Sequence, residues 1–271
     1  LAEQGKQEEA IEAYKKALSL KSDYARAAIN LVKIPLGRID NKTVVSLDQN
    51  LSLLCAQIED QSQRLFFEAN VLSHNGKYAD AFKVFVEANR IKWKSVAPSV
   101  KNLEHNYDVT IKRIKNWAPK SQYKTDSSIK KLFLLGPSRS GKSTLEHLLA
   151  AHPNVFPMFE NINLKSMNEP ESLTVGPKKL DMAKLFYCDD ENLLGSEYEV
   201  VTSTSPESIF HIDGLIDGLA NSFCVFVKRD RADIASEIFT REYKSGNFYS
   251  YNNLNILKYM KDLSFLEKRH L

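Results

Sequence analysis

The chain has 271 residues and a formal net charge of +3, with 43% hydrophobic and 26% charged residues. So small a charge argues against a dedicated nucleic-acid surface, but it leaves room for one basic pocket that takes a small anionic ligand. No apolar run approaches the roughly 20 residues that cross a bilayer, so no membrane span is expected. The length suffices for two domains, each with its own core.

The 3 cysteines and 6 histidines are scattered along the chain. Neither C-x-x-C nor H-x-x-x-H spacing occurs, so we expect no metal site on protein ligands. This cysteine usage fits a reducing compartment, and we expect a cytoplasmic protein. Because Leu1 already lies inside a helical pattern, we expect the natural N-terminus to lie upstream, which leaves a targeting signal open.

Small and aromatic residues recur at helical spacing in two N-terminal segments. They are Ala10, Tyr14 and Ala17 in the first segment, and Ala81, Phe85 and Ala88 in the second. Ala10 and Ala81 are 71 residues apart, close to two periods of the roughly 34-residue tetratricopeptide repeat. The spacing predicts a degenerate middle unit at 25–60 and an all-helical domain at 1–118, although an unrelated helical-hairpin domain remains an alternative. Such repeats typically bind or orient a partner.

The second half of the chain has a different pattern. After a helix expected at 100–117, residues 119–130 are polar and are typical of a linker. The run KLFLLG, the following loop and the run STLEHLLAAHP predict strand, loop and helix in that order. A second apolar run, SFCVFVKRD, predicts a buried central strand that ends in a basic pair. Residues 131–271 are therefore expected to form a P-loop-type α/β domain with a parallel sheet.

The loop GPSRSGKST fits the phosphate-binding pattern G-x-x-x-x-G-K-[ST]. Its backbone N–H groups and the following helix N-terminus would converge on an anion, with charge from Arg139 and Lys142. The candidate binding residues are Gly136, Pro137, Ser138, Arg139, Ser140, Gly141, Lys142, Ser143 and Thr144. A nucleoside triphosphatase would also need a carboxylate for Mg²⁺ at the end of a second strand. The best candidate is Asp213, although His211 interrupts the apolar run before it.

The stretch GPSRSGKSTLEHLLAAHP resembles the tetratricopeptide-repeat sulfotransferases, relatives of the protein-tyrosine sulfotransferases. Their loop typically has the form G-x-P-R-S-G-T-T and precedes a helix that ends in His-Pro. The interval from Gly136 to His152 and Pro153 matches without a gap. Ser138 replaces the usual Pro, and Lys142-Ser143 replaces the usual Thr-Thr, which creates the triphosphatase-like pattern. The resemblance implies a sulfotransferase fold that is C-terminally truncated, because the chain stops at Leu271 before the family's last strands.

The resemblance also implies roles for individual residues. Glu160 stands where the family has a general base, and Arg139 and Lys142 would assist catalysis at the transferred group. Arg229 and Ser236 correspond to the residues that bind a 3′-phosphate, although a strict count puts Lys228 in the arginine's place. The implied co-substrate is 3′-phosphoadenosine 5′-phosphosulfate, with no metal required.

One departure weakens the expectation of activity, because Thr204 stands where the family has a lysine. Three functions therefore remain open at this point. They are a sulfotransferase acting on a hydroxyl or amine, an ATP-dependent P-loop kinase or nucleoside triphosphatase, and a helical-repeat interaction protein with a degenerate nucleotide domain. The acceptor of a sulfotransferase would be a peptide, a glycan or a small molecule, bound with help from the helical repeats.

Overall fold

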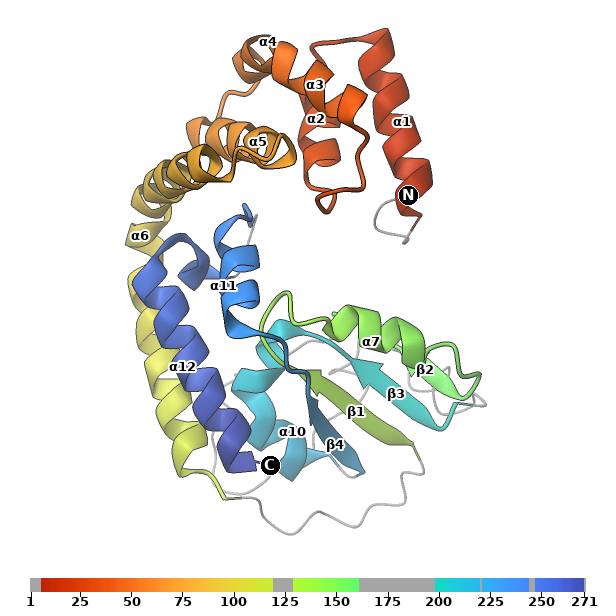
Figure 1. The fold of residues 1–271 in the computed structure, drawn as a ribbon. Helices are drawn as coiled ribbons and strands as arrows, with labels where there is room; N and C mark the ends of the chain where they lie inside the picture. The colour runs from red at the N-terminus through yellow and green to blue at the C-terminus, as the bar shows by residue number, and fades with distance from the viewer. Residues whose placement is uncertain (1–5, 119–128, 161–197, 220, 244–246, 271) are drawn as a thin grey trace. The chain divides into compact units, whose positions relative to one another are not determined.

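The computed structural model describes residues 6–118, 129–160, 198–219, 221–243 and 247–270 (Figure 1). These residues are mostly helical and include one parallel sheet of four strands. The chain divides into two compact units, Leu1–Val100 with Phe239–Ile256, and Lys101–Ile238 with Leu257–Leu271. The predicted domain boundary at 118–131 stays a prediction, because most of the expected linker lies outside the described residues.

Helices make up the described part of the N-terminal segment, as the repeat pattern predicted. They are α1 (Gln7–Leu20), α2 (Ala25–Val32), α3 (Asn41–Gln49), α4 (Leu51–Ala56), α5 (Gln61–His74) and α6 (Tyr78–Asn116). Gly76, in the turn between α5 and α6, has a φ of 72°, which glycine adopts without strain. The helix expected separately at 100–117 is instead the continuation of the 39-residue α6.

Three of the four alanines of the repeat pattern are buried, and Ala17 is half-buried. The buried ones are Ala10, Ala81 and Ala88, as expected of small residues in such repeats. Apolar side chains from α1 to α5 form one contiguous core. This core includes Ile11, Ala28, Leu31, Val32, Val44, Leu47, Leu54, Phe67 and Val71.

The second unit contains the sheet. Its strands are β1 (Lys130–Leu135), β2 (Val155–Pro157), β3 (Val200–Ser203) and β4 (Ser222–Phe226), in the order β2-β3-β1-β4 and all parallel. Phe133, Leu134 and Leu135 of β1 are buried at the centre. Because parallel strands end at the same sheet edge, the loop after β1 lies between the ends of β3 and β4 (Figure 1).

The position of β4 corrects one expectation. Its apolar sequence predicted a central strand, but among the described strands it lies at the edge of the sheet. Its exposure alternates, with Phe223 and Val225 48% and 41% exposed and Ser222 buried. Although β4 is an edge strand covered on one face, it has apolar residues on both faces. The hydrophobicity of its sequence therefore did not distinguish an edge strand from a central strand.

The structure describes further helices between and after these strands in the sequence. They are α7 (Lys142–Leu149), η4 (Pro206–His211), α10 (Ile212–Gly218), α11 (Arg231–Phe239), η5 (Phe248–Tyr251) and α12 (Asn253–His270). α7 contacts β1 and β2, and α10 contacts β4. The end of α6 joins this unit through Trp117, whose Nε1 donates to Asp217 Oδ2 at 2.7 Å, and Tyr107, whose hydroxyl donates to Asp262 at 3.2 Å.

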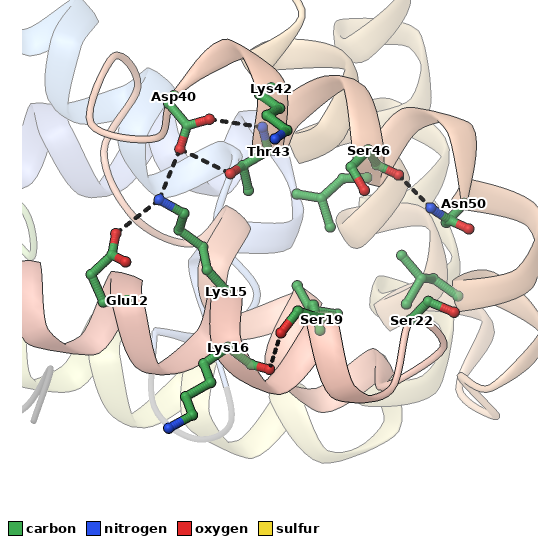
Figure 2. Close-up of a pocket in the computed structure, with 13 residues that line it drawn as sticks. Glu12, Lys15, Lys16, Ser19, Ser22, Asp40, Lys42, Thr43, Ser46 and Asn50 are labelled. Atoms are coloured by element: carbon green, nitrogen blue, oxygen red, sulfur yellow. Dashed lines mark hydrogen bonds and ion pairs between the residues drawn. The ribbon is translucent and has the colours of Figure 1, made fainter.

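A cleft of about 560 Å³ in the first unit is lined by residues of α1, α3 and α4 (Figure 2). At its edge Asp40 caps α3: its carboxylate accepts hydrogen bonds from the Thr43 N–H and hydroxyl, both at 2.9 Å. Lys15 Nζ lies 3.1 Å from Asp40 Oδ2 and 2.8 Å from Glu12 Oε1. The Thr43 hydrogen bonds and the Lys15 ammonium lower the pKa of Asp40 to about 2.

We expect Asp40→Ala to lower the free energy of unfolding by about 1 kcal/mol at pH 7, because α3 loses its N-cap. Asp40→Asn should cost less, since asparagine also caps helices. The folded pKa of Asp40 is depressed, so its charge-dependent stabilisation is complete above about pH 4 and is lost as the pH falls toward 2. Urea unfolding across this range tests both points. An Asp40→Asn cost at pH 7 equal to that of Asp40→Ala would contradict the capping role.

Candidate functional site

The loop between β1 and α7 has a backbone conformation suited to an anion. Gly136, Arg139 and Gly141 have positive φ angles of 146°, 69° and 97°. Gly141 precedes α7 and provides no side-chain cap, so first-turn N–H groups of the helix have no intrahelical partner. Left-handed residues within such a loop turn successive N–H groups toward one point. This arrangement can hold a phosphate or a similar anion.

Two chain segments approach each other so closely at position 136 that they limit which residue type can stand there. A Cβ there would lie 2.9 Å from the carbonyl oxygen of Val227 and 3.0 Å from Ser140 Oγ. Only glycine therefore fits between the start of the loop and the segment that follows β4.

Lys142 folds back onto the loop that precedes it. Its Nζ donates to the carbonyl oxygens of Gly136 and Pro137 at 2.9 and 2.8 Å. Two of the three ammonium donors are thus used within the loop. The residue is only 5% exposed, and this burial lowers the pKa of Lys142 to about 8, against an opposing effect of the Glu160 carboxylate.

Arg229, after the end of β4, contacts the loop from one side. Its Nη1 donates to the carbonyl oxygen of Arg139 at 3.1 Å. Each arginine also lies near an acid of α11: Arg229 Nε is 3.7 Å from Asp233, and Arg139 Nε is 3.4 Å from Glu237. All four side chains are well exposed, so these ion pairs are weak and exchangeable.

The other predicted residues on this side are exposed. Lys228 precedes Arg229, and Ser236 lies on α11 between the two acids. Within the loop, Pro137, Ser138 and Ser140 are buried, whereas Ser143 and Thr144 are exposed in the first turn of α7. The structure therefore brings the loop, Arg229 and α11 together, while the roles of the individual residues stay predictions.

Glu160 reaches the same site from the other side. It is exposed in the turn after β2, and its negative charge raises the pKa of Lys142 in opposition to the effect of burial. The predicted base and the predicted loop cation therefore lie within electrostatic range of each other.

The carboxylate considered for a magnesium site lies elsewhere. The stretch before Asp213 is the helical turn η4, and Asp213 itself is in the first turn of α10. Its carboxylate pairs with Arg113, whose Nε lies 2.7 Å from Oδ2. Among the described residues, no cluster of three His, Cys, Asp or Glu side chains is arranged to hold a metal.

Sequence reasoning missed Glu146 and the hydroxyl-rich segment beside it. Glu146 on α7 is fully buried, and its Oε1 accepts hydrogen bonds from Thr202 Oγ1 at 2.6 Å and Phe159 N at 3.0 Å. The five consecutive residues TSTSP begin at Thr202, and their four Ser and Thr side chains are buried. The sequence did contain one signal of this burial, because Glu146 stands among the apolar positions of STLEHLLAAHP. Thr204, the residue in place of the family's lysine, is one of these buried hydroxyls.

Comparison with known proteins finds one similarity, at the N-terminus. A family model described as a TPR repeat matches residues 1–31, which is consistent with the packing of α1 and α2. No curated protein and no solved structure matched the chain. None of the described helices has the length and apolar character of a membrane span.

Proposed function

We propose that the α/β part of the chain is a sulfotransferase that moves a sulfuryl group from 3′-phosphoadenosine 5′-phosphosulfate to an acceptor hydroxyl or amine. The observation that carries the proposal is the hydrogen bond from Arg229 to the Arg139 carbonyl. This bond holds the Arg229 guanidinium beside the loop, so that a second cation lies next to a loop that could bind a first phosphate. A donor with separate 5′ and 3′ anionic groups requires two such anchors, and the resemblance of the loop sequence supplies the donor's identity.

The loop residues and Lys142 would hold the 5′-phosphosulfate, and Arg229 with Ser236 would hold the 3′-phosphate. Two features of the loop fit such a group. Gly136 leaves no room for a side chain, and the buried Ser140 hydroxyl has no hydrogen-bond partner among the described residues. A bound anion would satisfy this hydroxyl.

Glu160 is the proposed general base. As the acceptor oxygen or nitrogen bonds to sulfur and the bond from sulfur to the 5′-phosphate oxygen breaks, its carboxylate takes the acceptor's proton. The charge that grows on the departing 3′,5′-bisphosphate is stabilised by Lys142 and Arg139. No step of this reaction assigns a role to a metal.

The G-K-S ending of the loop favours a second candidate, an ATP-dependent kinase or nucleoside triphosphatase. The ion pair between Asp213 and Arg113 counts against it, because this carboxylate is already engaged away from the strand ends. A third candidate follows from the TPR match: an interaction protein whose nucleotide domain lacks turnover. In the sulfotransferase the repeats would instead help bind the peptide, glycan or small-molecule acceptor.

We expect 3′,5′-adenosine bisphosphate to bind more tightly than Mg-ATP in titration calorimetry. Arg229→Ala should weaken bisphosphate binding at least tenfold, because an arginine fork can donate two hydrogen bonds to one phosphate. It should leave adenosine 5′-phosphosulfate, which lacks the 3′-phosphate, about unchanged.

Lys228→Ala is the matched control and should have a much smaller effect. If Lys228→Ala instead removes the preference for the 3′-phosphorylated nucleotide, then the strict residue count to Ser236 is correct and Lys228 stands in the place of the family's arginine. If Mg-ATP binds more tightly, the kinase candidate replaces the proposal. If neither nucleotide binds, the domain is not a sulfotransferase.

Lys142 predicts a pH dependence of bisphosphate binding. Its pKa is about 8 in the free protein, and a bound anion favours the ammonium and raises that pKa. Affinity should therefore be constant between about pH 7 and 8 and fall up to tenfold per unit above this range, because binding must then take up a proton. In Lys142→Gln affinity should be lower at pH 7 and should lack this fall. A pH dependence that persists in the variant would assign the titration to another group.

A further inference from the structure

Glu146 is a fully buried carboxylate on α7, one helical turn after Lys142. Burial of a carboxylate is unfavourable unless hydrogen bonds compensate. Here Oε1 accepts two, from Thr202 Oγ1 at 2.6 Å and from the backbone N–H of Phe159 at 3.0 Å. Oε2 has no partner among the described residues. The side chain thus joins the helix of the loop to two segments far from it in sequence.

Phe159 is held in an unfavourable backbone conformation by these contacts. Its φ is 51°, which is uncommon for a bulky residue. While its N–H donates to Glu146, its carbonyl oxygen accepts hydrogen bonds from Thr204 N at 2.8 Å and Ser203 Oγ at 3.1 Å. Both peptide groups of Phe159 are therefore fixed, one by α7 and the other by the end of β3.

The residue that follows this fixed turn is Glu160. Because the carbonyl of Phe159 belongs to the same peptide group as the N–H of Glu160, the two hydrogen bonds to that carbonyl also orient the start of Glu160. Glu146 itself has no exposed surface on which an acceptor could reach it. Its carboxylate can act on the site only through the turn that it holds.

We propose that Glu146 is a positioning residue, which keeps the Phe159 turn in its left-handed conformation so that the Glu160 carboxylate stays within electrostatic range of the Lys142 ammonium. The inference rests on the proposed function insofar as Glu160 is the general base. The juxtaposition of Glu160 and Lys142 can be measured without any ligand, so it is tested separately from nucleotide binding.

The experiment follows the Lys142 ammonium by the ¹³Cε resonance of labelled lysine in the full chain, titrated by pH. The Lys142 signal is identified by its absence in Lys142→Gln. In Glu160→Gln the apparent pKa of Lys142 should fall below the wild-type value, because the negative charge that raises it is removed. Glu146→Ala should lower it by a similar amount, because the turn relaxes and Glu160 moves away.

Glu146→Gln is the matched control. Its amide oxygen can accept the same two hydrogen bonds as Oε1, so the Lys142 pKa should stay near that of the wild type. If Glu146→Gln lowers this pKa as far as Glu146→Ala does, then Glu146 acts through its charge and the positioning role is wrong. An unchanged pKa in folded Glu146→Ala, or in Glu160→Gln, also overturns the proposal.

Thr202→Val gives an independent test if Glu146→Ala does not fold. Valine has nearly the shape of threonine but removes the 2.6 Å hydrogen bond to Oε1, so that the Phe159 N–H is the donor that remains to it among the described residues. We expect a smaller fall of the Lys142 pKa in the same direction, and no change would contradict the positioning role. A purely stabilising function of the cluster would lower the melting temperature in each variant without moving this pKa.

Discussion

The geometry of the candidate site depends on the tight turn between β1 and α7. Two contacts hold this turn: the Lys142 ammonium bridges two carbonyl groups of the loop, and Gly136 lies against the carbonyl of Val227. The first contact sets the loop on the N-terminus of α7, and the second sets it against the segment after β4. Because β1 lies between β3 and β4, residues that follow the strands on both sides of it can approach the loop: Arg229 donates to the Arg139 carbonyl, and the Glu160 charge acts on Lys142.

The cations around the loop are of two kinds. The two arginines can exchange their present partners for a ligand, whereas Lys142 cannot. Arg139 and Arg229 are exposed and lie near acids of α11 at 3.4 and 3.7 Å, in pairs worth at most about 1 kcal/mol each. An anion could therefore recruit either guanidinium at little cost. Lys142 is buried and bound to carbonyl oxygens, so its position depends on the fold rather than on a ligand. This division separates a lysine that the fold fixes from adjustable arginines at the rim of the candidate site.

Those parts of the fold whose signals are local could be predicted from the sequence. Glycine and lysine spacing located the loop, and the recurring alanines located the helical repeats. The edge position of β4 could not be predicted, because strand order depends on pairing between residues that lie far apart in the chain. Asp213 was considered as a metal ligand for the same reason: nothing nearby in sequence indicates that Arg113, 100 residues earlier, pairs with it. Glu146 was missed because a glutamate in an amphipathic helix ordinarily faces solvent.

The burial of Glu146 is difficult to explain by stability alone. Even a buried ion pair can often be replaced by apolar residues of similar size with a neutral effect or a gain of about 1–4 kcal/mol. Glu146 is paired with neutral donors only in the described residues, and one oxygen of its carboxylate has no partner there. An apolar side chain in that place would pack against β3 but could not accept the N–H of Phe159. The left-handed conformation of Phe159 would then lack its compensating hydrogen bond, and the chain could relax to a more favourable φ. The carboxylate is thus better explained by the turn that it imposes on the segment leading to Glu160 than by its contribution to the core.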